Sequence, residues 1–243
     1  MVAYDERTQR YFDEHTPEYT PGRYSALVEF LRADATDGSS LLDIGCGSGS
    51  GLKVLVDNTP VSDVAGLDVS PAYLDKCAAL LPGCQTCLAS ILDEDLQIKV
   101  GRRFRYVLAG AILHHLVGRD RKESLAHARE GLRAAWSLVE EGGGLVVMEP
   151  TYSPRWLMSS LFHVKRLVSR VASGRVTLFG HWNNIGEPIV SYFSHDELVR
   201  EVAALPGAGK ALEVEGARRI PWPWRLAGVT RRAESVVIAR KQA

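Results

Sequence analysis

The sequence predicts an α/β fold, a parallel sheet with helices on both of its faces. Short apolar segments alternate with helix-compatible segments from about residue 40 to residue 149, which is typical of such a sheet. The chain has 243 residues, 46% of them hydrophobic, which is enough to bury one substantial core. Strands are expected near 40–44, 63–67, 85–88, 104–109 and 143–149, with helices near 50–57, 71–80 and 119–140.

The flanking segments extend this pattern. Residues 4–33 favour two helices that are broken near residues 20–22, and residues 156–171 read as an amphipathic helix. Ser194 and Glu197 have the spacing of a capping box, which predicts that a further helix begins there. Two late strands, near 211–220 and 234–240, would complete a seven-stranded sheet.

Composition excludes several kinds of partner. Lys+Arg and Asp+Glu both number 29, and this zero formal charge argues against a nucleic-acid binder. No apolar run approaches the length of a membrane span, and no signal-peptide pattern is present, so we expect a cytoplasmic protein. The cysteines lack the second close pair that a zinc site needs, so we expect reduced thiols and no metal.

The run from residue 41 to residue 51 carries most of the functional information. An apolar strand ends near Asp43, and glycines follow at every second position, Gly45, Gly47 and Gly49. Glycine permits a tight turn and a close approach of the backbone to a ligand. A dinucleotide fingerprint, G-x-G-x-x-G, would need a glycine where this chain has Ser50, so the spacing does not fit a nicotinamide cofactor.

A second apolar strand ends in Asp68, 25 residues after Asp43. A carboxylate at the end of the second strand of a βαβ unit can accept hydrogen bonds from both hydroxyls of an adenosine ribose. Ser70 and Pro71 then read as the N-cap and first position of the next helix.

The pattern Asp43-x-Gly45-x-Gly47-x-Gly49 resembles the first motif of class I S-adenosylmethionine (AdoMet)-dependent methyltransferases. Residues 113–116 (Leu-His-His-Leu) and 142–150 are similar to the group that holds quinone-biosynthesis and natural-product sugar O-methyltransferases. The resemblance implies a Rossmann-like seven-stranded sheet with AdoMet as cofactor. It also implies one domain in four parts: N-terminal helices (1–34), a cofactor-binding core (35–150), a substrate cap after the fifth strand (151–193), and a C-terminal helix and strands (194–243).

The resemblance assigns the cofactor contacts residue by residue. The glycine loop with Cys46 would line the methionine end, Asp68 with the adjacent Val69 would hold the ribose, and Ala109 and Gly110 would pass beside the methionine portion. The family commonly has an Asp after the third strand to accept from the adenine amine, whereas Ala89 and Ser90 stand there in this chain. Both are still expected to line the cofactor, and Ser90 can offer a hydroxyl or backbone contact. Tyr19 and Arg23 are further candidates, Tyr19 to close over the cofactor and Arg23 to meet its carboxylate.

The expected reaction is methyl transfer to a small-molecule acceptor, most simply a hydroxyl of a sugar or another secondary metabolite. Histidine is a suitable general base because its ordinary pKa lies near neutral pH, and His114 and His115 follow the fourth strand. Glu149, at the end of the fifth strand, is expected to orient a histidine or to accept from the substrate. Expected acceptor-lining residues are Tyr11, His181, Trp182, Asn183 and Tyr192.

Two alternatives stay open at this point. One is C-methylation of a lipid-like quinone, with the helix at 156–171 resting on a membrane surface, although an ordinary lid helix is preferred. The other is a non-catalytic AdoMet-binding partner subunit. The oligomeric state is open as well, and a homo-oligomer is compatible with the sequence.

Overall fold

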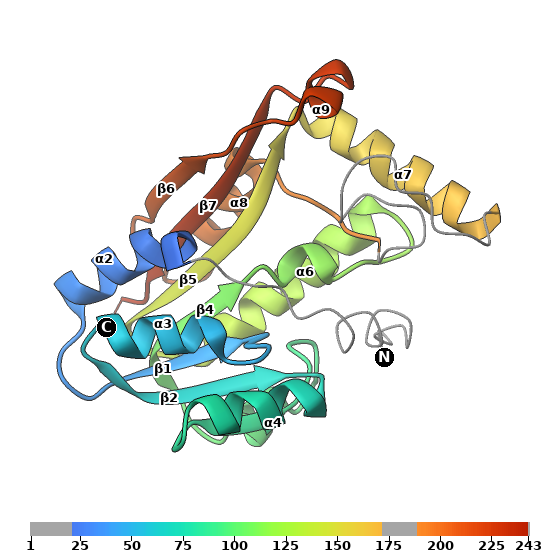
Figure 1. The fold of residues 1–243 in the computed structure, drawn as a ribbon. Helices are drawn as coiled ribbons and strands as arrows, with labels where there is room; N and C mark the ends of the chain where they lie inside the picture. Colours follow the sequence, from blue (N-terminus) through green and yellow to red (C-terminus); the bar gives the residue numbers. More distant parts are fainter. Residues whose placement is uncertain (1–20, 172–188, 243) are drawn as a thin grey trace.

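A computed structural model describes residues 21–171 and 189–242, and Figure 1 shows their arrangement. The strands form one seven-stranded sheet in the order β3-β2-β1-β4-β5-β7-β6. The strands from β3 to β5 are parallel to their neighbours, whereas β7 runs antiparallel to both β5 and β6. The sheet therefore has the expected parallel half and an antiparallel edge supplied by the late strands.

The described strands are β1 (Ser39–Ile44), β2 (Val61–Asp68), β3 (Gln85–Leu88), β4 (Phe104–Gly110), β5 (Val139–Ser153), β6 (Leu212–Ala217) and β7 (Arg231–Arg240). The described helices are η1 (Pro21–Tyr24), α2 (Ser25–Asp34), α3 (Ser50–Asn58), α4 (Pro71–Leu80), α5 (Leu96–Val100), η2 (Leu113–His115), α6 (Arg121–Ser137), α7 (Arg155–Val171), α8 (His195–Ala203) and α9 (Trp222–Leu226).

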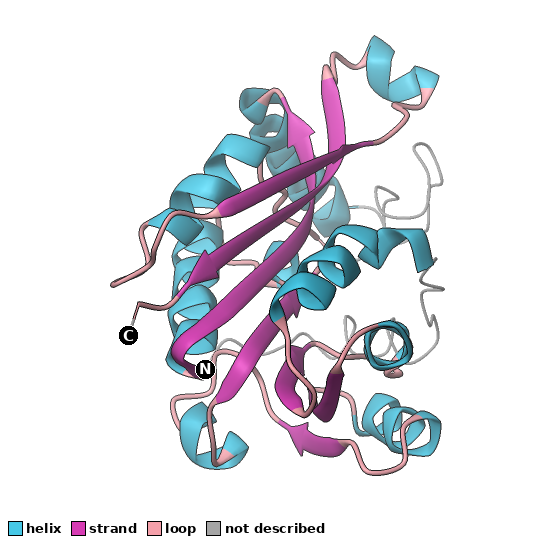
Figure 2. Cartoon of the chain, turned by 90° about the vertical axis from the view of Figure 1, so that its left-hand side faces the viewer, coloured by secondary structure: helices cyan, strands magenta, loops and turns pink. Residues whose placement is uncertain are grey.

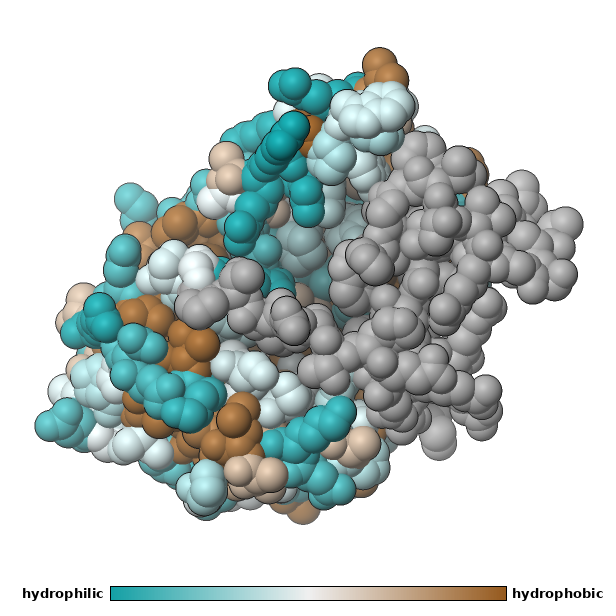
Figure 3. Space-filling view, viewed as in Figure 1, coloured by the Kyte–Doolittle hydropathy of each residue, from teal (hydrophilic) through white to brown (hydrophobic). Residues whose placement is uncertain are grey.

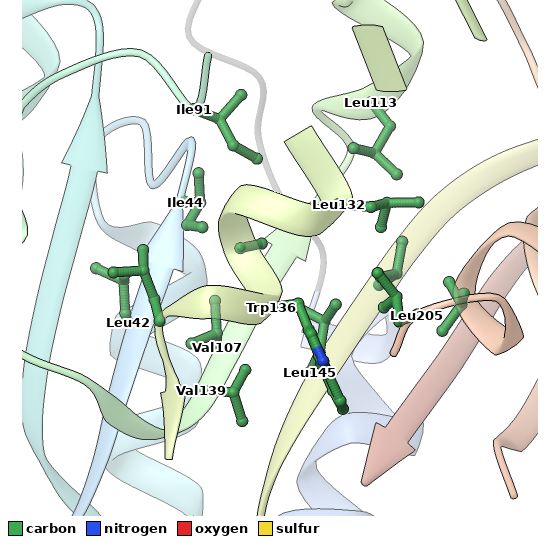
Figure 4. Packing of buried hydrophobic residues seen from close by; sticks show 14 of the residues in the cluster. Leu42, Ile44, Ile91, Val107, Leu113, Leu132, Trp136, Val139, Leu145 and Leu205 are labelled. Atoms are coloured by element: carbon green, nitrogen blue, oxygen red, sulfur yellow. The ribbon is translucent and has the colours of Figure 1, made fainter. Parts of the chain in front are cut away.

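Helices cover both faces of the sheet (Figure 2). Successive residues of a strand point to opposite faces, so Leu145 and Val147 of β5 pack in one core while Val146 packs in the other. The first core lies under α5, α6 and α8, and Figure 4 shows Leu132 and Trp136 of α6 packed among strand residues there. The second core lies under α2, α3 and α4. Burial on both faces explains why the central strands read as continuous apolar runs.

Several boundaries differ from the expectation. β5 continues to Ser153 and not to about 149, because β7 begins at Arg231 and pairs with the whole extension. α9 occupies residues that were expected to connect two late strands, and α5 was not expected at all. Both helices have only five residues, and so few positions cannot display a helical repeat.

The parallel strands end at a single edge, where the chain turns at Ile44, Asp68 and Gly110. In α/β sheets, ligands bind beyond this carboxyl edge, at the point where the strand order reverses. Here the reversal falls between β1 and β4, which are adjacent in the sheet. Among the described residues, the longest helices are too short or too polar to cross a bilayer.

Candidate active site

The glycine loop after β1 is held against the end of β2 by backbone hydrogen bonds. The amides of Gly45 and Cys46 both donate to the carbonyl oxygen of Leu67, at 2.7 and 3.1 Å. The backbone φ angles of Gly45, Gly47 and Gly49 are +78°, +53° and +80°, which L-residues with a side chain rarely adopt. The alternating glycines are therefore required by the path of the chain itself.

These glycines face different surroundings. A Cβ built on Gly45 would lie 2.2 Å from Cγ2 of Ile112, and one on Gly49 would lie 2.7 Å from Sγ of Cys77. A Cβ on Gly47 would meet no protein atom within 4 Å. The missing side chains of Gly45 and Gly49 thus leave room for Ile112 and Cys77 to pack against the loop, whereas the backbone at Gly47 faces open space. Gly47 is consequently the glycine at which a ligand can approach the loop most closely.

Asp68 connects the glycine loop after β1 to the turn after β2. Its Oδ2 accepts from the Gly47 amide and its Oδ1 accepts from the Ser70 amide, both at 2.9 Å. Burial raises the pKa of Asp68, while the backbone amides that it accepts from oppose that rise. Each carboxylate oxygen has a second lone pair, so the side chain can still accept hydrogen bonds from a ligand beside Gly47. Asp43, at the end of β1, is buried, and burial raises its pKa well above the ordinary value.

The turn after β3 is organised by a carboxylate that the sequence analysis did not assign. Ala89 is buried, and the amide of Ser90 donates to Oδ2 of Asp93 at 3.0 Å. The same Asp93 oxygen accepts from Nζ of Lys99 at 2.8 Å. The turn thus has an anionic group three residues beyond the position where the family pattern would place it. Val69 lies half-buried at the neighbouring strand end.

The end of β4 contains a residue in a rare conformation. Ala109 is fully buried and Gly110 ends the strand, after which Ala111 has a φ of +57°, the only positive φ of a non-glycine residue in the described ranges. Its amide donates to the carbonyl oxygen of Met148 at 2.7 Å. Such backbone strain is concentrated at functional sites. Sequence reasoning missed Ala111 because nothing in its residue type signals a left-handed conformation.

Beyond β4, a buried side-chain pair joins the ends of two strands. Nδ1 of His114 lies 2.6 Å from Oε2 of Glu149, and the other Glu149 oxygen, Oε1, accepts from the Leu113 amide at 2.7 Å. Glu149 is fully buried and His114 is 5% exposed. The structure therefore places Glu149 in contact with His114, as one of the two roles expected for Glu149 requires.

Burial shifts both groups toward their neutral forms. It lowers the pKa of His114 to about 3 and raises the pKa of Glu149 to about 8. Burial therefore holds the pKa of His114 below the ordinary histidine value on which the sequence expectation rested. His115 is half-buried beside it, with ring centroids 4.0 Å apart, and burial likewise lowers the His115 pKa well below its ordinary value.

Arg23 lies on this side of the edge, but its guanidinium is already paired. Its Nη2 and Nε donate to Oε1 of Glu234 on β7, at 2.7 and 3.0 Å. Its positive charge lowers the pKa values of both His114 and Glu149. A cofactor carboxylate would have to compete with Glu234 for Arg23, so the structure supports an electrostatic role for Arg23 more directly than the expected ligand contact.

A row of aromatic rings leads away from the histidine. Tyr192 stacks on His114 with centroids 5.5 Å apart, Tyr152 lies 4.6 Å from Tyr192, and Trp224 stacks on Tyr152 at 5.9 Å. Tyr192 was expected near the acceptor, whereas Tyr152 and Trp224 were missed. The missed signal was the two late tryptophans, Trp222 and Trp224, in a segment that was interpreted as a link between strands.

Other predicted residues fall elsewhere. Tyr11, Tyr19, His181, Trp182 and Asn183 lie outside the described residues.

The cysteine thiols are free, and Sγ of Cys77 and Sγ of Cys84 are 4.0 Å apart. Within residues 21–171 and 189–242, no group of three or more His, Cys, Asp or Glu side chains is arranged to hold a metal ion.

The residues at the edge fit a cofactor that contains adenosine. The open space in front of Gly47 admits the ligand, and Asp68 offers carboxylate lone pairs beside it. The backbone of Ala109 to Ala111 lies one strand away, at the reversal point.

Known proteins resemble this chain in sequence. Residues 42–143 match a family described as a methyltransferase domain. The chain is 33% identical over 75 residues to a trans-aconitate 2-methyltransferase of Enterobacter sp. (strain 638), and the match spans 30% of this chain and 30% of that relative's length. It is 27% identical over 190 residues to a dTDP-3-amino-3,4,6-trideoxy-alpha-D-glucopyranose N,N-dimethyltransferase of Streptomyces venezuelae, which covers 72% of this chain and 74% of the relative.

The fold also has solved counterparts. CalS10, an amino pentose methyltransferase from Micromonospora echinaspora solved with S-adenosylmethionine bound, aligns with a TM-score of 0.56. The alignment covers 100% of this chain and 99% of that one, at 18% sequence identity. At this identity the likeness establishes the fold alone.

Proposed function

The chain belongs to the class I AdoMet-dependent methyltransferases, and from this premise we propose that it methylates a hydroxyl group of a small molecule, such as a sugar or another secondary metabolite. AdoMet is the cofactor, and it supplies an activated methyl group on a sulfonium. The protein must then align the acceptor with that methyl group and remove the acceptor's proton. The observation that carries the proposal is the buried pair formed by His114 and Glu149.

Asp68 and the Gly47 backbone are proposed to hold the cofactor. In this proposal Asp68 keeps its bonds to the Gly47 and Ser70 amides and uses its remaining lone pairs for the ribose hydroxyls. Gly45 and Gly49 contribute indirectly, because each lets a neighbouring side chain pack against the loop. The loop is therefore preorganised, and binding need not order it.

His114 is proposed as the general base and Glu149 as the group that orients it. When Glu149 is ionised, it accepts the Nδ1 proton of His114 and leaves a lone pair on Nε2 to take the acceptor's proton. When Glu149 is protonated, it donates to Nδ1, and Nε2 then carries a hydrogen and is no longer a base. Since the Glu149 pKa is raised to about 8, the competent form is populated at mildly alkaline pH.

The row of aromatic rings is proposed to bind the ring of the acceptor molecule. Tyr192 packs on His114 and Tyr152 packs on Tyr192, and flat rings of this kind pack against the apolar faces of sugar or polyketide rings. Tyr192 is held in place from its backbone, because its carbonyl oxygen accepts from Arg121 at 2.7 Å.

A second candidate acceptor is an amine on a sugar. The Streptomyces venezuelae relative is an N,N-dimethyltransferase of an amino sugar, and the match covers 72% of this chain. An ammonium must lose a proton before its nitrogen can attack a methyl group, so the same base would serve. The hydroxyl and the amine proposals therefore differ in the acceptor group, and both give His114 the same role.

The test is methyl transfer from labelled AdoMet to a matched panel of acceptors. The panel pairs hydroxylated sugars and phenols with amino sugars of the same ring size, and it adds a quinone. Label in a hydroxyl-bearing product, identified by mass spectrometry, is the expected result. Transfer only to amines would replace the hydroxyl proposal with the second candidate. Binding of S-adenosylhomocysteine without transfer to any acceptor, at any pH up to 9, would contradict both.

A further inference from the structure

The tip of the sheet beyond the aromatic row exposes large apolar side chains. Trp222 and Leu226 of α9 are 73% and 78% exposed, and Trp156 at the start of α7 is 66% exposed. Figure 1 shows α9 directly above the beginning of α7, at the far end of β6 and β7. Trp222 and Leu226 are four residues apart, so they project from the same side of the one-turn helix. Singly exposed apolar side chains are ordinary, but large ones grouped at one end of a protein mark an interaction surface.

This exposure does not come from a loosely held segment. The amide of Thr230 donates to the carbonyl oxygen of Ser153 at 2.8 Å, and the amide of Val229 donates to that of Trp224 at 2.9 Å. Trp224 and Val229 pack in a hydrophobic cluster with Leu157, Met158 and Val190, so the opposite side of α9 is fixed to the protein. Trp222 and Leu226 are therefore presented outward from an anchored support.

The same tip carries unbalanced positive charge. Residues 216–233 include Arg218, Arg219, Arg225, Arg231 and Arg232 and no Asp or Glu, although the whole chain has a net charge of zero. Arg231 pairs with Glu215 on β6, and Arg232 donates to the carbonyl oxygen of Arg219. The side chains of Arg218, Arg219 and Arg225 are exposed and make no ion pair with the residues that the structure describes.

Figure 3 shows the resulting surface, with strongly hydrophilic and apolar or pale residues side by side at the upper end of the molecule. Tryptophan prefers the boundary between lipid headgroups and acyl chains, and leucine adds apolar area that can enter it. Arginine is attracted to anionic headgroups within about a Debye length of the surface. The two kinds of side chain are complementary to one surface, an anionic bilayer.

We propose that this protein docks peripherally on anionic membranes through the tip formed by Trp156, Trp222, Leu226, Arg218, Arg219 and Arg225. Trp222 and Leu226 insert at the headgroup boundary while the arginines contact lipid phosphates and carboxylates. Three separated apolar side chains surrounded by cations suit shallow insertion, whereas a stable protein partner requires a broader apolar centre, with about 800 Å² buried on each side. The tip is distinct from the proposed catalytic pair, so docking is independent of the acceptor.

The experiment is co-sedimentation of the full chain with vesicles, either of phosphatidylcholine alone or of phosphatidylcholine with phosphatidylserine. We expect binding to the anionic vesicles, weakened by high salt. The double variant Trp222→Ser/Leu226→Ser should bind poorly, and replacing Arg218, Arg219 and Arg225 by Gln should weaken binding by about fivefold for each arginine. Unchanged affinity for S-adenosylhomocysteine verifies that the variants are folded.

A matched control is available at the other end of the sheet. Ile98 on α5 is 82% exposed, so Ile98→Ser removes as exposed an apolar side chain without touching the tip. Ile98→Ser should bind anionic vesicles like the unmodified protein. Failure of the unmodified protein to sediment with anionic vesicles would overturn the proposal, as would equal loss of binding in Ile98→Ser. Binding to poly-glutamate in place of vesicles would also overturn it, and would indicate an acidic protein partner instead.

Discussion

At the glycine loop the key contacts of Asp68 are all with backbone amides, whereas beyond β4 and β5 Glu149 contacts both a backbone amide, that of Leu113, and a side chain, that of His114. Asp68 accepts from two backbone amides, Gly47 and Ser70. His114 and Glu149 contact each other, and their charges are influenced by Arg23, which in turn is held by Glu234. The two regions share one edge of the sheet but are held in place by different means.

Because of this difference, the two regions should respond differently to a change in pH. A site built from backbone amides is set by the path of the chain, and those donors do not titrate. A site built from a buried histidine and carboxylate depends on proton occupancy, because burial moves both pKa values far from their ordinary ranges. We therefore expect the transfer rate to depend on pH more strongly than cofactor affinity does.

The largest expected effect is on the rate. His114→Ala should lower methyl transfer by roughly 10²–10⁴, the usual contribution of a positioned general base, with little change in cofactor affinity. The measurement is single-turnover transfer with labelled AdoMet, accompanied by calorimetry with S-adenosylhomocysteine.

His115→Ala is the comparison variant for this prediction. His114 is the histidine whose Nδ1 lies 2.6 Å from Glu149, so His115→Ala should retain much more activity. A greater loss in His115→Ala would move the base to the neighbouring ring. Near-normal rates in both variants would make the histidines packing residues, and an acidic carbon would become the better acceptor.

The glycine loop was easier to predict from the sequence than the region around His114 and Glu149. The spacing of Gly45, Gly47 and Gly49 and the strand end at Asp68 are local patterns, so they could be identified from a few adjacent residues. The strands were predictable because their apolar runs are buried on both faces. The parallel half of the sheet and its total of seven strands are confirmed, and residues 42–143 match a methyltransferase domain.

The other region could not be derived in the same way. Glu149 lies 35 positions from His114, so the sequence suggested a histidine partner for Glu149 without fixing which one, and Glu234 lies 211 positions from Arg23, so no local pattern indicated that ion pair. The helix after Ser194 illustrates the limit. Ser194 caps it as expected, but the carboxylate of Glu197 pairs with Arg121 and does not complete a capping box. The carboxylate of Glu197 thus bonds to a residue far away in the sequence and not to the nearby backbone amide of Ser194.

The next effect is on cofactor binding. Asp68→Ala should weaken S-adenosylhomocysteine binding by about 2–4 kcal/mol, given ~1.5–3 kcal/mol for each hydrogen bond to a charged group and incomplete additivity. Asp63→Ala is the matched control, because Asp63 lies on the same strand but pairs with Arg102 away from the carboxyl edge. A change below about threefold in the Asp68 variant would place the ribose elsewhere.

The smallest expected effect concerns the pH profile. The transfer rate of the unmodified enzyme should rise with pH and level off above pH 8, because the Glu149 pKa is about 8 and only its ionised form leaves Nε2 of His114 unprotonated. Arg23 lowers the Glu149 pKa, so Arg23→Gln should move the midpoint upward. At pH 7 the rate should then fall, by less than the roughly tenfold that a full unit represents. The measurement is the pH–rate profile at saturating cofactor.

The partner of Arg23 supplies the control. Arg23→Gln also releases the negative charge of Glu234, whereas the double variant Arg23→Gln/Glu234→Gln removes one charge of each sign. The double variant should therefore shift the midpoint less than the single one. A profile that falls with rising pH would assign the titrating group to an acid and not to a base. If Arg23→Gln instead weakens S-adenosylhomocysteine binding and leaves the midpoint unchanged, Arg23 acts on the cofactor carboxylate, and the two regions of the edge share that residue.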